Sequence, residues 1–109
     1  MNEIDPLLAV EFLQRNAKAF SDAKGERIFI ENYLKTVKSR LMQQSKSKSL
    51  GDREADAYAH ADYVEQLNGL REAVKAEELL KLLITAASAK LEVWKVDSFN
   101  KRQELKSLM

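Results

Sequence analysis

The sequence predicts an all-α fold in which two long helices form an elongated antiparallel hairpin of coiled-coil type. The 109 residues include only three Gly and one Pro, and the chain is rich in residues that favour helices. Apolar residues recur at spacings of three and four along most of the chain, as they do on one face of a helix. The strongest interruption is a serine-rich stretch near the middle. We therefore expect one helical domain over residues 1–109.

The first helix is predicted to span about residues 6–45. Asp5 is a favoured N-cap, and Pro6 suits the first helical position because an amide donor there has no partner in the helix. An apolar stripe follows from Val10 through Phe20 to Met42. Polar residues before Gly25 offer an alternative, a kink or a break near that glycine. A continuous helix is preferred because the stripe stays nearly in phase, while glycine costs only about 1 kcal/mol relative to alanine.

A loop over about residues 46–51 and a second long helix, starting near residue 52 or 62 and ending near 106, complete the predicted hairpin. Asp52 is one candidate N-cap, and Asp62, three residues before Glu65, is the other. A short helix over 53–59 then either precedes the long helix or is continuous with it. Asn68-Gly69 is a common turn dipeptide, but helical patterning on both sides favours a helix there. A short loop between two long helices makes them antiparallel neighbours.

The second long helix carries more apolar surface than one partner helix covers, because residues 79–84 point to nearly every side. Either the N-terminal segment folds back as a third element or two chains associate. We expect an antiparallel homodimer, since an exposed apolar band requires a partner. The predicted contact band consists of Leu80, Leu83, Ile84, Ala87, Leu91 and Trp94.

The formal net charge of +1 excludes a global attraction to nucleic acid or membrane, but the charges are unevenly distributed. Candidate phosphate contacts form two clusters, one of Lys35, Lys38, Arg40, Lys46 and Lys48 and another of Lys95, Lys101, Arg102 and Lys106. In a hairpin the acidic segment 52–66 opposes the first cluster, and neutralisation within the fold is the preferred interpretation. The alternative is electrostatic, salt-sensitive binding of DNA or RNA.

Motifs for catalysis, metals and cofactors are missing from the sequence. The absence of cysteine excludes disulfides and cysteine-based zinc sites, and the single histidine, His60, excludes a di-iron site built from two Glu-x-x-His motifs. No glycine-rich phosphate loop occurs. The acidic first residues and the lack of a membrane-length apolar segment favour a cytoplasmic protein that does not contact membranes. We expect no enzymatic activity, no cofactor and no metal.

Several short runs are shared with one group of proteins: Arg53-Glu54-Ala55, Ala57-Tyr58, Tyr63, Leu67 to Ala73 and Leu91 to Lys95. Over roughly residues 23–102 the chain resembles small helical proteins of unknown function that are encoded by bacteriophages and prophages. The resemblance implies a cytoplasmic setting in a bacterial host and supplies no catalytic residues. The expected function is that of a non-enzymatic accessory protein acting through homo-oligomerisation and protein contacts. The alternative is a DNA- or RNA-binding accessory factor in phage DNA metabolism.

Overall fold

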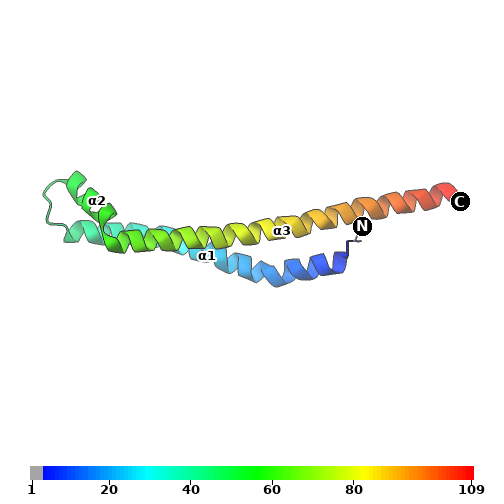
Figure 1. Ribbon diagram of the computed structural model, residues 1–109, viewed down its shortest axis with the longest axis horizontal. Helices are drawn as coiled ribbons and strands as arrows, with labels where there is room; N and C mark the ends of the chain where they lie inside the picture. The colour runs from blue at the N-terminus through cyan, green and yellow to red at the C-terminus, as the bar shows by residue number, and fades with distance from the viewer. Residues whose placement is uncertain (1–3) are drawn as a thin grey trace. The chain divides into compact units, whose positions relative to one another are not determined.

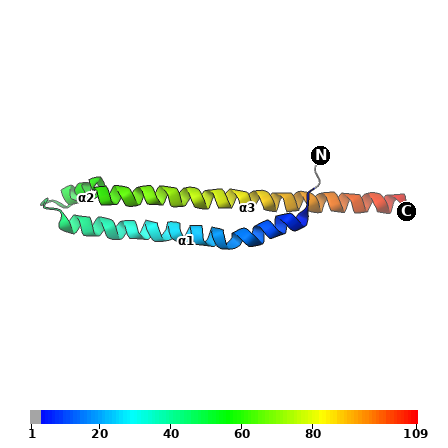
Figure 2. The same ribbon diagram turned by 60° about the horizontal axis from the view of Figure 1, so that its bottom comes forward.

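The computed structural model describes residues 4–109, and this part of the chain is all-α with no strand (Figures 1 and 2). Three helices follow one another: α1 over Pro6–Gln44, α2 over Leu50–Ala59 and α3 over Ala61–Leu108. The chain divides into two compact units. Unit 1 comprises Met1–Phe20 and Leu79–Met109, and unit 2 comprises Ser21–Glu78. Both α1 and α3 therefore contribute residues to each unit.

The start of α1 confirms the predicted cap. Asp5 Oδ1 accepts hydrogen bonds from the amides of Leu7 at 2.9 Å and Leu8 at 3.4 Å. These bonds satisfy donors that a helix start leaves without partners. Further along, α1 passes through Gly25 as uninterrupted helix, and the φ angle of this glycine is not positive.

The caps of α2 and α3 differ from the sequence-based expectation. Ser49, not Asp52, caps α2: its hydroxyl accepts from the amide of Asp52 at 3.1 Å, so that Leu50 and Gly51 belong to the helix and not to the loop. His60, not Asp62, caps α3, with Nδ1 accepting from the amide of Asp62 at 3.0 Å. In both cases a residue with extended backbone directly before the helix supplies the acceptor.

Unit 2 has a small core in which Val37, Leu41 and Ala57 are buried, and Tyr33 and Tyr63 are among the side chains packed against it. The least exposed positions recur at alternating spacings of three and four, a period of 3.5 residues that is typical of coiled-coil seams. They are residues 23, 27, 30, 34, 37 and 41 on α1, and residues 63, 66, 70, 73 and 77 on α3.

Unit 1 brings the first part of α1 beside the second part of α3, as both views show (Figures 1 and 2). The least exposed positions again alternate in spacing on α1, at residues 6, 9, 13, 16 and 20, and on α3 from residue 80 through 84 and 87 to 91, after which the next such position is residue 98. We call the latter set the inner stripe of α3. Ala9 and Ala87 are buried, whereas residues 99–109 are exposed. None of the helices within residues 4–109 is long and apolar enough to cross a membrane.

Candidate interaction surface

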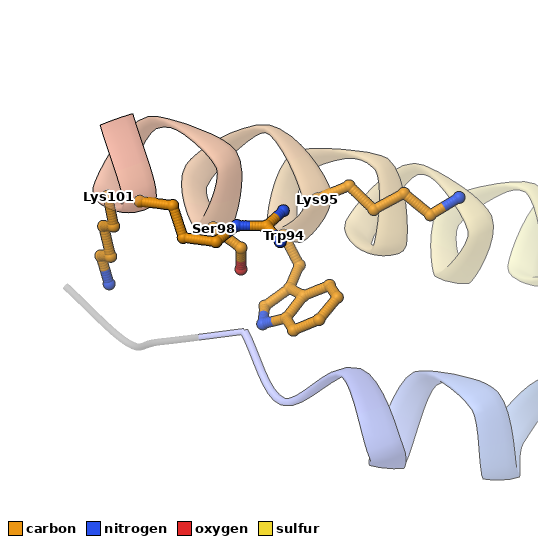
Figure 3. A pocket seen from close by; sticks show the side chains of 5 residues that line it. Trp94, Lys95, Ser98 and Lys101 are labelled. Atoms are coloured by element: carbon orange, nitrogen blue, oxygen red, sulfur yellow. The ribbon is translucent and has the colours of Figure 1, made fainter. Parts of the chain in front are cut away.

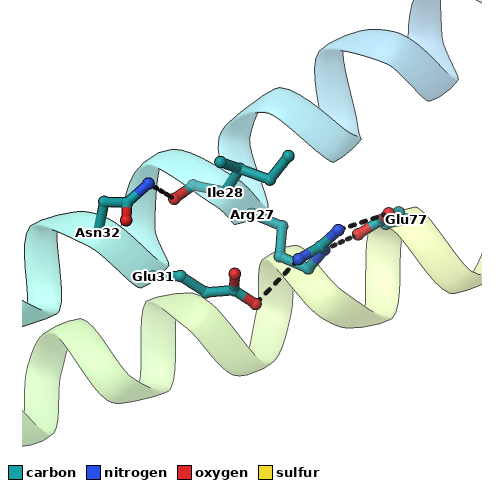
Figure 4. A network of polar contacts seen from close by, with 5 residues as sticks. All are labelled: Arg27, Ile28, Glu31, Asn32 and Glu77. Carbon is teal, nitrogen blue, oxygen red and sulfur yellow. Dashed lines mark hydrogen bonds and ion pairs between the residues drawn. The ribbon is translucent and has the colours of Figure 1, made fainter.

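Within unit 2, a charged pair joins α1 to α3 among the least exposed positions. Arg27 Nη2 lies 3.2 Å from Glu77 Oε1, and Arg27 Nε donates to Glu77 Oε2, while Nη1 reaches Glu31 at 2.9 Å (Figure 4). The hydrogen bonds that Arg27 donates to Glu77 and, with a smaller effect, to Glu31 raise the pKa of Arg27 above its ordinary value because they stabilise the charged guanidinium. A charged pair inside an apolar seam can specify which residues face each other, so we expect this contact to favour the observed pairing of the two helices in unit 2.

The first basic cluster lies in unit 2, and one of its members is paired. Lys38 Nζ lies 2.8 Å from Glu54 Oε1 and 4.6 Å from the ring centroid of Tyr58. The hydrogen bond from Lys38 holds the pKa of Glu54 below its ordinary range. The other four members, Lys35, Arg40, Lys46 and Lys48, are exposed. The expected neutralisation by the segment 52–66 is therefore seen at Lys38.

Another acid of that segment, Asp56, has hydroxyl partners. Its Oδ2 accepts from Ser45 Oγ at 2.6 Å and from Ser47 Oγ at 2.7 Å. These two bonds lower the pKa of Asp56 because they stabilise the ionised carboxylate. They also tie the connection between α1 and α2 to α2 itself.

The predicted contact band is divided between two environments in unit 1. Leu80, Ile84 and Leu91 are half-buried and Ala87 is buried, and all four belong to the inner stripe of α3. The remaining two members are more accessible, with Leu83 42% exposed and Trp94 39% exposed.

A second set of apolar residues follows the opposite side of the same part of α3, and we call it the outer stripe. It consists of Leu79, Leu82, Ala86, Ala89, Val93 and Val96, all of which are exposed. The four larger side chains are 49–64% exposed. None of these residues belongs to the predicted contact band, although their spacings of three, four, three, four and three are a recognisable signal of a helix-packing face.

A groove of about 610 Å³ opens between α1 and α3 of unit 1. Its walls are mainly apolar, with one acid and two bases at the margin. The lining residues are Ile4, Asp5, Leu8, Ala9, Phe12 and Arg15 from the start of the described chain, and Leu83, Ala86, Ala87 and Lys90 from α3. Because Ala86 belongs to both, the groove is continuous with the outer stripe.

Trp94 stands at a second hollow, of about 420 Å³, in which most of the second basic cluster gathers. Trp94, Lys95, Ser98, Lys101 and Arg102 line it, and the indole points from α3 toward the start of α1 (Figure 3). Lys95 Nζ also lies 3.2 Å from Glu92 Oε1. The hollow thus combines an aromatic face with cationic groups, which is a chemistry that suits phosphates and stacked bases.

Within residues 4–109, no three His, Cys, Asp or Glu side chains gather in a group that could hold a metal ion. His60 caps α3, and its Nδ1 lies 3.9 Å from Asp62 Oδ2. The chain matches no protein-family model, and searches of curated proteins and of solved structures found no significant match.

Proposed function

We propose that this chain is a non-enzymatic accessory protein that acts by forming a homodimer and by contacting other proteins. Its helices would form an antiparallel hairpin of coiled-coil type, in keeping with the alternating spacing of the least exposed positions on α1 and α3. The observation that carries the proposal is the outer stripe of α3, an apolar face that α1 leaves exposed within unit 1. Contiguous apolar faces on soluble helices mark interaction sites.

We also propose that the protein acts in the cytoplasm of a bacterial host. The resemblance of the runs around Tyr58 and Trp94 to phage- and prophage-encoded helical proteins supports an accessory role in the cytoplasm of a bacterial host.

Analytical ultracentrifugation over a range of micromolar concentrations tests the proposal directly. We expect the sedimenting mass to approach twice 12.4 kDa as concentration rises. Mass action requires this concentration dependence if two chains bind reversibly. A mass of one chain throughout the range contradicts homodimerisation.

The hollow at Trp94 favours a second candidate function, the binding of single-stranded DNA or RNA. Lys101 and Arg102 lie beside the indole, so a phosphate could approach the cations while a base stacks on the ring. Trp94 is the only tryptophan, and its fluorescence would report binding directly. This function requires quenching by oligonucleotides at low salt, a loss of affinity as salt rises, and weaker binding in Lys101→Gln/Arg102→Gln.

The matched control for that titration is Lys46→Gln/Lys48→Gln, which removes two charges from the first basic cluster. If both double variants weaken binding equally, the attraction depends on total charge and not on the Trp94 hollow. If oligonucleotides leave the fluorescence and mobility of the protein unchanged at low salt, the second candidate is wrong.

A further inference from the structure

We propose that a second copy of this chain packs antiparallel on the outer stripe of α3, with the twofold axis between Ala86 and Ala89. The inference rests on the proposed homodimer and names the face and direction of association. That face differs from the inner stripe, where Leu80, Ile84 and Leu91 are half-buried within unit 1.

The outer stripe has the spacing and the limits of a packing seam. Its six positions alternate between steps of three and four over about 26 Å of helix, at about 1.5 Å per residue. The positions that continue this spacing beyond the stripe are polar: Glu72 and Lys75 before it, and Asn100 and Gln103 after it. The apolar seam is therefore confined to residues 79–96, all within unit 1.

The side chains of the outer stripe match those of a second outer stripe that runs in the opposite direction. With the axis between Ala86 and Ala89, these alanines face each other, Leu82 faces Val93, and Leu79 faces Val96. Small residues at the centre let two helices approach closely, and each larger aliphatic side chain meets another on either side. Such self-complementarity is what a twofold interface requires.

The charges beside the stripe favour the antiparallel direction. In a parallel pair, Glu92 of each copy would lie beside Asp97 of the other, which places like charges together twice. The ion pair of Glu92 with Lys95 offsets little of this repulsion because both side chains are exposed. In the antiparallel pair, Glu92 instead lies beside Thr85, and Lys90 lies beside Leu83.

The corresponding exposed face of α1 does not offer an equivalent partner surface. With the same alternating spacing of three and four, this face begins with Leu7 and Val10 but continues with Gln14, Ala17 and Ser21. The apolar part is thus two residues long, whereas the outer stripe of α3 has six. Among the faces of this chain, the surface that matches the outer stripe in length and character is the outer stripe of another copy.

Engineered disulfides test the arrangement, because the native chain has no cysteine. Three variants are compared under mild oxidation: Leu82→Cys, Val93→Cys and the double variant with both changes. In the antiparallel pair, position 82 faces position 93, so we expect rapid cross-linking of the double variant and of an equimolar mixture of the single variants. Each single variant alone places its two sulfurs about 16 Å apart along the helices, whereas a disulfide joins Cα atoms no more than about 7 Å apart.

Ultracentrifugation of the native chain is performed in parallel with the cross-linking. Dimers without an 82–93 cross-link overturn the inference and leave the proposed function standing. Cross-linking of Leu82→Cys alone, at a rate equal to that of the double variant, shows a parallel pair and overturns the antiparallel arrangement. A monomeric native chain overturns both, and the outer stripe then belongs to a different protein partner.

Discussion

Arg27 of α1 and Glu77 of α3 form an ion pair between the two helices of unit 2. Both belong to the least exposed positions of their helices, and the neighbouring positions of this kind hold small or apolar residues. On α1 these neighbours are Ala23 and Ile30, and on α3 the preceding member is Ala73. The Arg27 side chain is 24% exposed and that of Glu77 is 12% exposed. Any shift of one helix along the other would separate the two charges and place at least one of them against apolar side chains. We therefore expect charge as well as shape to specify the pairing in unit 2.

Reversal of one charge tests this role. We expect Arg27→Glu to lower the melting temperature by several degrees, because two carboxylates would then face each other. Arg27→Glu/Glu77→Arg should recover most of the loss, since the pair is restored with opposite polarity. Circular dichroism at neutral pH measures both variants. If the double variant is no more stable than the single one, the contact does not set the register.

The buried end of unit 2 should be sensitive to truncation. Leu41 is 4% exposed, and its replacement by alanine is expected to lower the free energy of unfolding by about 3 kcal/mol through lost burial and a residual cavity. Leu50, 71% exposed at the start of α2, provides the same substitution with an expected change within about 0.5 kcal/mol. Urea denaturation of the two variants gives the comparison. Equal losses would mean that the core of unit 2 does not lie at Leu41.

The helical fold was largely predictable from sequence, whereas the ends of α2 and α3 were not. Asp5-Pro6 is a strong local signal, and the structure confirms the cap. At the next helix, Ser49 and Asp52 are both good capping residues, and the choice between them depends on the backbone angles before the helix. Histidine is not among the favoured N-caps, so the residue types at the start of α3 favour Asp62 over His60 as the cap.

The candidate surface was predictable as an excess of apolar residues but not as a particular face. Leu79 and Leu80 begin two different stripes, and both stripes have alternating spacings of three and four. Periodicity cannot decide which stripe α1 covers. Packing decides it: within unit 1 the inner stripe is half-buried or buried at Leu80, Ile84 and Ala87, while the outer stripe is exposed.

Acid should destabilise unit 2 partly through Asp56. Its pKa in the folded chain lies below the ordinary value of 3.8, so its contribution to stability is present above that value and is lost as pH falls through the folded pKa. Ser45→Ala/Ser47→Ala removes both hydroxyl donors and should flatten the fall in melting temperature as the pH drops below about 4. Ser88→Ala, at an exposed position on α3, should retain the slope of the native chain. Identical slopes in all three would contradict the assignment to Asp56.

Gly69 is a position where the native chain can be stabilised. It lies in the interior of α3 at an exposed site, and a Cβ atom added there would meet nothing within 4 Å. Gly69→Ala is therefore expected to raise the free energy of unfolding by about 0.5–1 kcal/mol, because alanine loses less backbone entropy in a helix. Gly25→Ala on α1 should behave similarly. Thermal unfolding of the variants measures the change. A loss of stability in either variant would contradict the prediction and would indicate that the glycine backbone is strained.

A charge placed on the outer stripe should separate the proposed dimer without unfolding the chain. Leu82 is 64% exposed, so Leu82→Glu costs little in an isolated chain but would bury a carboxylate between two copies. We expect the dissociation constant to rise by about tenfold or more, since every 1.4 kcal/mol corresponds to about a factor of ten. Leu67→Glu makes the same exchange at a 46% exposed position of α3 outside the stripe, and it should leave association unchanged. Ultracentrifugation, with circular dichroism to verify helix content, distinguishes the two variants. Dissociation by Leu67→Glu but not by Leu82→Glu would move the interface from unit 1 to unit 2.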